Sequence, residues 1–135
     1  MSVSEQASRS RQELGDCVAE LGQLAEVAKS RGGLVRGSLY EFRRRCGKAG
    51  CRCSRGGLHS GRALGVSAGG WARPVSLKGI DVATLSDHVE AYRRVRKARA
   101  EMVKVFAKLL ATADRLEHLR EIPVSQLRQQ GQAKA

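Results

Sequence analysis

The sequence contains few aromatic residues, few prolines and no long apolar run. Only 4% of its 135 residues are aromatic and two are proline, so a core must be built mainly from Leu, Val and Ala. No stretch approaches the roughly 18 apolar residues of a membrane span, and the N-terminus lacks the basic start and apolar stretch of a signal peptide. We therefore expect a cytoplasmic protein that does not enter a membrane.

Acidic residues are nearly absent from the middle of the chain. Residues 36–78 contain ten basic side chains and one acid, Glu41, and so supply nine of the twelve net positive charges. Positive charge that is localised in this way indicates a polyanionic partner. The scarcity of carboxylates also leaves no cluster that could bind Mg²⁺ or act as a general base, so we do not expect an enzyme.

Apolar spacing predicts an α+β fold in one domain over residues 1–123. The stripe formed by Leu14, Val18, Leu21 and Ala28 predicts an amphipathic helix over residues 4–31. Residues 34–78 are rich in glycine and lack helical spacing, which is typical of a small antiparallel β element. The expected strands are residues 38–43, 63–67 and 72–77, with a hairpin turn at 68–71 and with the third strand, which contains proline, at an edge.

A long helix is predicted over residues 81–121, capped by Asp81 or Thr84. Its apolar residues recur every seven positions, which indicates a coiled-coil-like seam that the N-terminal helix could cover within the chain or across a homodimer. The seam residues are Val95, Met102, Leu109 and Leu116, with Leu85, Val89, Tyr92, Phe106, Ala113 and Leu119 on the same side. Residues 124–135 are expected to form a flexible tail.

Three cysteines and a histidine lie close together in the basic segment. Cys46, Cys51, Cys53 and His59 match the inventory of a Cys₃His site, and we predict that they bind one Zn²⁺ ion. Nearby arginines favour the thiolates that a metal requires, and Gly47, Gly50, Gly56 and Gly57 permit tight turns. Two alternatives remain open: reduced thiols that pack as small hydrophobes, and an iron–sulfur cluster. The isolated Cys17 is expected in the core.

The basic side chains around this predicted Cys₃His site are the candidate nucleic-acid contacts. Guanidinium groups held by a structured element suit phosphate, and the small number of aromatic residues favours duplex DNA over single strands. The candidate residues are Arg36, Arg43, Arg44, Arg45, Lys48, Arg52, Arg55, Arg62 and Arg73.

From about Gly37 to the end of the long helix, the chain resembles a family of small uncharacterised bacterial and archaeal proteins that are often found in mobile genetic elements. Four motifs carry the resemblance: Arg36-Gly37-Ser38-Leu39, the R-R-C-G-K-x-x-C-x-C run from Arg44 to Cys53, His59-Ser60-Gly61, and Gly69-Gly70. The resemblance implies an accessory role in DNA transactions, with a recombinase or transposase as a partner. The alternative function is a coiled-coil interaction module in which the Cys/His element is a structural staple.

Overall fold

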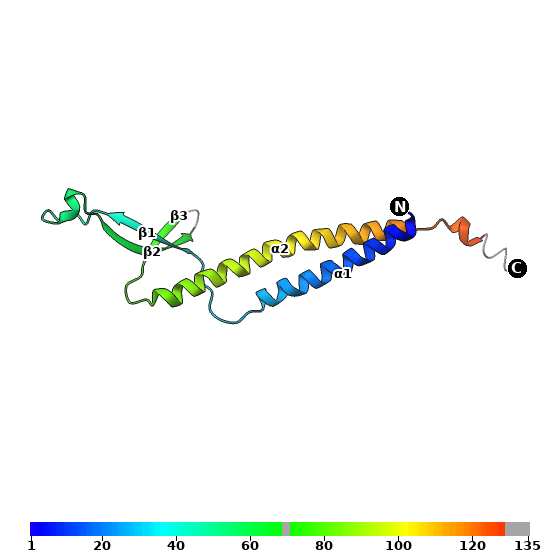
Figure 1. Cartoon of the computed structure of the whole chain (residues 1–135), viewed down its shortest axis with the longest axis horizontal. Coiled ribbons are helices and arrows are strands. Elements are labelled where there is room, and N and C mark those ends of the chain that lie inside the picture. Colours follow the sequence, from blue (N-terminus) through cyan, green and yellow to red (C-terminus); the bar gives the residue numbers. More distant parts are fainter. Residues whose placement is uncertain (69–70, 129–135) are drawn as a thin grey trace. The chain divides into compact units, whose positions relative to one another are not determined.

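The structure is a computed structural model that describes residues 1–68 and 71–128 of the chain (Figure 1). It contains two helices and a small antiparallel sheet, which confirms the predicted α+β class. The elements follow in the order α1 (Val3–Ala28), β1 (Ser38–Arg44), the 3₁₀ turn η1 (Arg52–Arg55), β2 (His59–Ala68), β3 (Trp71–Ser76) and α2 (Val82–Arg120).

The chain divides into two compact units. Of the described residues, the helical unit contains 1–29 and 97–128, and the sheet unit contains those of 30–96. The helix α2 therefore contributes its first part to the sheet unit and its remainder to the helical unit. None of the described helices is long and apolar enough to cross a membrane.

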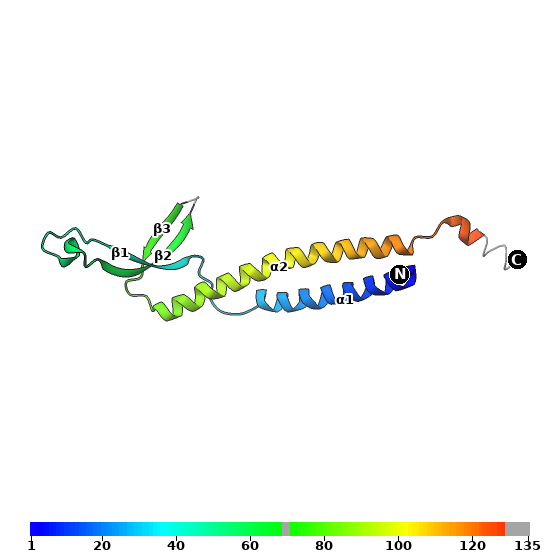
Figure 2. The same cartoon turned by 45° about the horizontal axis from the view of Figure 1, so that its top comes forward.

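The sheet has the strand order β1-β2-β3, and both neighbouring pairs are antiparallel (Figure 2). Pro74 lies on β3 at an edge, as predicted. Ala68 pairs with Trp71, and the centre of the predicted turn, residues 69–70, lies outside the described residues. β2 begins at His59, four residues earlier than predicted, because Gly61 pairs with Phe42 and gives no apolar signal of its own.

The core of the sheet unit lies between the sheet and the first part of α2. Leu64 on β2 packs with Leu85 and Val89, and the partly buried residues Val35, Leu39, Val66 and Leu77 surround them. Leu85 and Val89 were assigned from sequence to the helical seam. The structure corrects this part of the prediction, because the sheet presents an apolar face to them.

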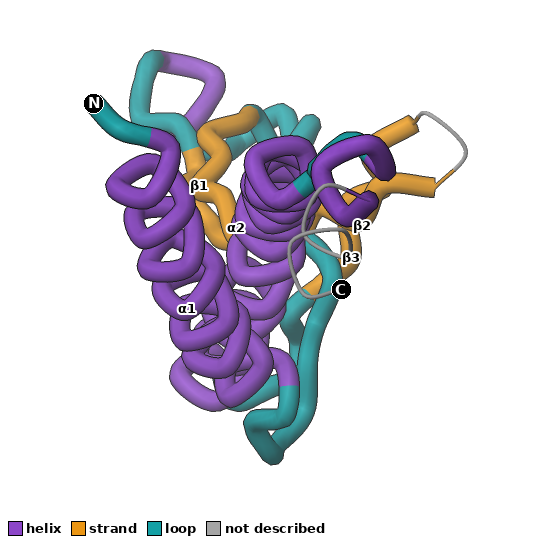
Figure 3. Tube along the Cα trace, turned by 90° about the vertical axis from the view of Figure 1, so that its right-hand side faces the viewer, coloured by secondary structure: helices purple, strands orange, loops and turns teal. Residues whose placement is uncertain are grey.

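In the helical unit, α1 and the second part of α2 run side by side in opposite directions (Figures 1 and 3). The residues buried on α1 are Ala7, Ser10 and Cys17, which confirms the expected core position of Cys17. Those buried on this part of α2 are Ala98, Val105, Thr112 and Leu116. Glu13 Oε2 joins the helices, because it accepts hydrogen bonds from Thr112 Oγ1 at 3.4 Å and Arg115 Nη1 at 3.3 Å.

Local side-chain contacts set the helix ends. Ser2 Oγ accepts from the Glu5 N–H at 3.1 Å, and the Glu5 carboxylate accepts from the Ser2 N–H at 3.2 Å, which is a capping box for α1. Asp81 caps α2, because its carboxylate accepts from the Thr84 hydroxyl at 2.7 Å and the Ala83 N–H at 3.2 Å. Residues 124–128 form a short helical segment, and the rest of the predicted tail lies outside the described residues.

Candidate functional site

Three thiols and an imidazole converge at the loop that joins β1 to β2. Cys46 follows β1, Cys51 caps η1, Cys53 lies within η1, and His59 is the first residue of β2. Their ligand atoms all lie within 4.8 Å of one another. The Sγ atoms of Cys46 and Cys53 are 3.4 Å apart, and Cys51 Sγ lies 3.1 Å from His59 Nε2. The four residues predicted from sequence as metal ligands thus form one cluster.

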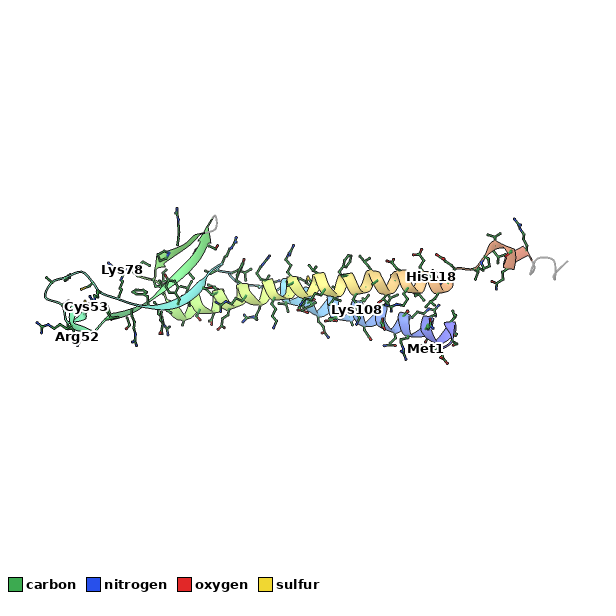
Figure 4. The ribbon with its side chains drawn as sticks, turned by 90° about the horizontal axis from the view of Figure 1, so that it is seen from above. Met1, Arg52, Cys53, Lys78, Lys108 and His118 are labelled. Carbon is green, nitrogen blue, oxygen red and sulfur yellow. The ribbon has the colours of Figure 1, made fainter. Side chains whose placement is uncertain are left out.

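Backbone geometry explains how closely spaced residues reach a common point. Gly47 and Gly56 adopt φ angles of +80° and +113°, a region that favours glycine, so both sharp turns need the residue found there. The Cys51 N–H donates to the Lys48 carbonyl at 3.2 Å, and the Ser54 hydroxyl donates to the Cys51 carbonyl at 2.7 Å. These bonds fold the loop of residues 45–58 back on itself, and Figure 4 labels Cys53 and Arg52 within it.

The thiols of Cys46 and Cys53 differ in acidity. The backbone N–H of Lys48 and the neighbouring Cys53 side chain lower the pKa of Cys46 to about 6. The Cys46 N–H donates to Cys53 Sγ at 3.3 Å and acts to lower the pKa of Cys53, but burial and the neighbouring sulfurs raise it, and the net shift is upward. Of the two thiols, Cys46 is therefore the one that ionises more readily.

All nine candidate phosphate-binding side chains are exposed. Six of them lie at the end of β1 or within the loop and η1, close to the Cys/His cluster along the chain, and we call these the loop cations: Arg43, Arg44, Arg45, Lys48, Arg52 and Arg55. Within the part of the chain that the structure describes, none of the six forms an ion pair with a carboxylate. The loop therefore presents unneutralised positive charge.

The other three candidates lie elsewhere in the sheet unit. Arg36 precedes β1, Arg62 lies on β2 and Arg73 lies on β3. The strand register places Arg62 and Arg73 on the same sheet face as Leu64, whereas Arg44 lies on the opposite face with Phe42. Arg62 Nε also lies 3.6 Å from Glu41 Oε1. The nine candidate side chains are thus spread over both faces of the sheet, and six of them lie in or beside the loop.

Phe42 is a functional candidate that sequence reasoning did not assign to the site. Its ring lies 4.8 Å from the guanidinium carbon of Arg44, a cation–π contact. A groove of about 570 Å³ is lined by Phe42, Arg44, Arg45, Cys46, His59 and Ser60. The available signal was the alternation along β1, which places Phe42 and Arg44 on the same face of the strand.

No family model matches this sequence. Searches of curated proteins and of solved structures likewise find none similar to it. The resemblance to mobile-element proteins therefore stays a prediction, and the interpretation of the site depends on its own geometry.

The cluster has the composition and size of a metal site. In a tetrahedral site with metal–sulfur bonds of about 2.3 Å, neighbouring sulfurs lie roughly 3.8 Å apart. The Sγ atoms of Cys46 and Cys53 are 3.4 Å apart, and all four ligand atoms lie within 4.8 Å of one another, so the cluster is close to that size. Cys46, Cys51, Cys53 and His59 can therefore hold a metal ion, which would close the loop between β1 and β2.

Proposed function

We propose that this protein binds duplex DNA through its phosphate backbone, and that a Zn²⁺ ion held by Cys46, Cys51, Cys53 and His59 orders the loop that makes the contact. The observation that carries the proposal is the coincidence of two features in one loop. The loop gathers four potential metal ligands, and it also exposes the loop cations without carboxylate partners among the described residues.

The donor set favours zinc among the common metals. Thiolate and imidazole ligands suit Zn²⁺, whereas Mg²⁺ and Ca²⁺ require oxygen ligands. Four protein ligands also match a structural site, in which no coordination position is left open for catalysis. This supports a binding protein and not an enzyme, with the metal acting as a cross-link between the end of β1 and the start of β2.

The arrangement of arginines favours contact with phosphates. A guanidinium group presents a rigid set of donors that matches phosphate oxygens, and arginines on an ordered loop lose less conformational entropy on binding than those on a disordered tail. Arg44 and Arg45 both line the groove beside Cys46 and His59. A phosphate group in this groove would meet two cations at once.

The environment of Phe42 favours duplex over single-stranded nucleic acid. Single-strand binders stack bases on exposed aromatic faces. The Phe42 ring contacts Arg44, and it also covers Gly61, where an added Cβ would lie 2.7 Å from Phe42 Cζ. The ring is therefore engaged by its own chain and is a poor base-stacking platform. DNA, as opposed to RNA, follows from the resemblance to proteins of mobile elements, as does an accessory role beside a recombinase or transposase.

The test is the anisotropy of a labelled random-sequence duplex, titrated with protein between about 50 and about 200 mM salt. If the six loop cations each neutralise one phosphate, the log–log slope should be about −5. Replacing Arg43, Arg44 and Arg45 by alanine should reduce the magnitude of the slope by about 3.

The charge-matched control replaces Arg36, Arg62 and Arg73, and should change the slope much less. An equal effect of the two triple variants would argue against a loop-centred surface, and absence of wild-type binding at low salt would refute DNA binding.

A second function is supported by a different observation. Several large apolar side chains of the helical unit are exposed, among them Val18, Val103 and Phe106. These favour a protein-interaction module in which the Cys/His element only staples the sheet. Heparin distinguishes the two functions, because it should displace DNA bound through arginines and should leave a complex made through apolar side chains intact.

A further inference from the structure

The helical unit exposes an apolar stripe on α2 beside its buried face. The stripe residues are spaced four and three apart in alternation, so they lie along one side of the helix. At its centre Val103, Phe106 and Leu110 are 59%, 53% and 49% exposed. The complete stripe, which we call the outer stripe, is Arg99, Val103, Phe106, Leu110, Ala113 and Glu117.

The outer stripe is on only one side of the α1–α2 pair. On the other side, Glu13 of α1 accepts hydrogen bonds from Thr112 and Arg115 of α2, so polar side chains of the two helices are paired there. On the side of the outer stripe, a groove of about 500 Å³ lies between the helices and is lined by Leu21, Ala25, Arg99, Met102, Val103 and Phe106. An apolar face widened by one row beyond the buried seam is typical of a helix with two helical neighbours. α1 packs on the buried seam, whereas the centre of the outer stripe is exposed.

The exposed side of α1 next to this groove carries small residues. Gly15, Val18, Gly22 and Ala25 are spaced three and four apart, and Val18 is 61% exposed. An added Cβ at Gly15 or Gly22 would meet nothing within 4 Å. Each glycine costs the helix about 1 kcal/mol relative to alanine, and no contact within the described chain requires either one. Their position gives a further helix room to approach.

The opposite charges at the two ends of the outer stripe, Arg99 and Glu117, favour a second copy of the same helix as its partner. Read in the reverse direction, the stripe places Glu117 opposite Arg99, Ala113 opposite Val103, and Leu110 opposite Phe106. An antiparallel pair of α2 helices from two chains would therefore bury apolar residues at the centre and form two Arg99–Glu117 pairs at the ends. A parallel pair would place like charges together.

We infer that a second copy of this chain packs on the outer stripe, with the two α2 helices antiparallel, to form a homodimer. The order of four- and three-residue steps is the same in both directions from residue 108. A single two-fold axis beside residue 108 therefore brings all the residue pairs named above together at once. This inference is independent of DNA binding and of the metal.

The test measures molar mass by light scattering and dimer dissociation by sedimentation equilibrium, without nucleic acid. The wild-type protein is expected to be dimeric. Arg99→Glu and Glu117→Arg should each weaken the dimer about 5- to 30-fold, because each reverses both end pairs. The double variant should recover wild-type affinity. An equimolar mixture of the two single variants should form a heterodimer more stable than either homodimer.

Two further variants separate dimerisation from folding. Phe106→Glu should give a folded monomer with unchanged helical circular dichroism, because Phe106 is exposed within the chain. Lys108→Glu reverses the charge of an exposed side chain on the opposite side of α2 and should leave the mass unchanged. A wild-type monomer at about 100 μM, or a double variant that fails to recover affinity, would overturn the proposal, and so would a monomer that binds only other proteins through the stripe.

Discussion

At the scale of single residues, the loop thiols should differ in reactivity. In the metal-free protein Cys46 has a pKa of about 6, whereas the pKa of Cys53 is raised and Cys17 is buried. Because a lowered pKa keeps the thiolate present down to about pH 6, Cys46 should be alkylated first by iodoacetamide near neutral pH. Its rate should rise as the pH increases through about 6.

Peptide mapping by mass spectrometry after timed alkylation would measure this order. Cys46→Ser provides the control, in which the fast-reacting thiol should disappear. Preferential labelling of Cys53, or a rate that rises only around the ordinary thiol pKa of about 8.5, would contradict the acidity assigned to Cys46.

Substitutions of His59 would test whether this residue is one of the four proposed metal ligands. His59→Ala removes one of four donors and should lower zinc affinity by more than the roughly 10- to 100-fold that follows loss of an outer-shell partner. His59→Cys supplies a fourth sulfur and should retain one zinc per chain, because Cys₄ sites are also closed tetrahedral sites. Competition with a chromophoric chelator measures both. Equal affinities of wild type and His59→Ala would exclude His59 as a ligand.

At the scale of elements, Gly61 determines how closely Phe42 packs on β2. An alanine Cβ at this position would lie 2.7 Å from Phe42 Cζ, so the ring must move. Gly61→Ala should lower the free energy of unfolding by about 1–3 kcal/mol, the usual cost of overpacking. Urea denaturation measures the change. Gly50→Ala is the matched control, since its Cβ would meet nothing within 4 Å, and a comparable loss there would refute the packing explanation.

In the helical unit, Glu13 connects two elements, because it accepts hydrogen bonds from side chains of α2. Thr112 is only 1% exposed and donates to Glu13, so Glu13→Ala leaves a buried hydroxyl without its acceptor. We expect a loss of about 1–3 kcal/mol in the free energy of unfolding. Adding Thr112→Val should recover part of it, because the polar group is then absent. If the double variant is no more stable than Glu13→Ala alone, the buried hydroxyl is not the cause.

The helices, the first strand and the candidate ligands could be predicted from sequence, because each depends on one local sequence pattern. Helical spacing identified both helices, alternation identified β1, and the short spacing of Cys46, Cys51, Cys53 and His59 identified the cluster. The start of β2 was missed because Gly61 and Ser60 carry no alternation, and pairing with β1 forms the strand there. Phe106 was placed on the seam, but it lies on the outer stripe. Spacing alone cannot show which side of a broad apolar face the partner helix covers.

At the scale of the whole molecule, the division into two units implies that loss of the proposed metal would act on one of them. The candidate ligands all belong to the sheet unit, and the helical unit is held by its own buried residues and by Glu13. Metal that is bound only by the folded state stabilises it by about 2.7 kcal/mol at a hundredfold excess over Kd. Removing the metal should therefore weaken the pairing of β1 with β2 and leave the contacts between α1 and α2 in place.

Amide hydrogen exchange with and without a chelator would test this. Exchange should accelerate in residues 38–44 and 59–67 and change little in residues 98–116, while the helical circular dichroism stays nearly constant. A variant with Ser at Cys46, Cys51 and Cys53 should exchange like the chelated protein and should not respond to the chelator. If the protein binds DNA as proposed, its DNA affinity should fall in parallel, because the loop cations would lose their ordered scaffold. Uniform acceleration across both units would show that the metal stabilises the whole molecule, and no change in either would show that the cluster does not bind metal in the folded protein.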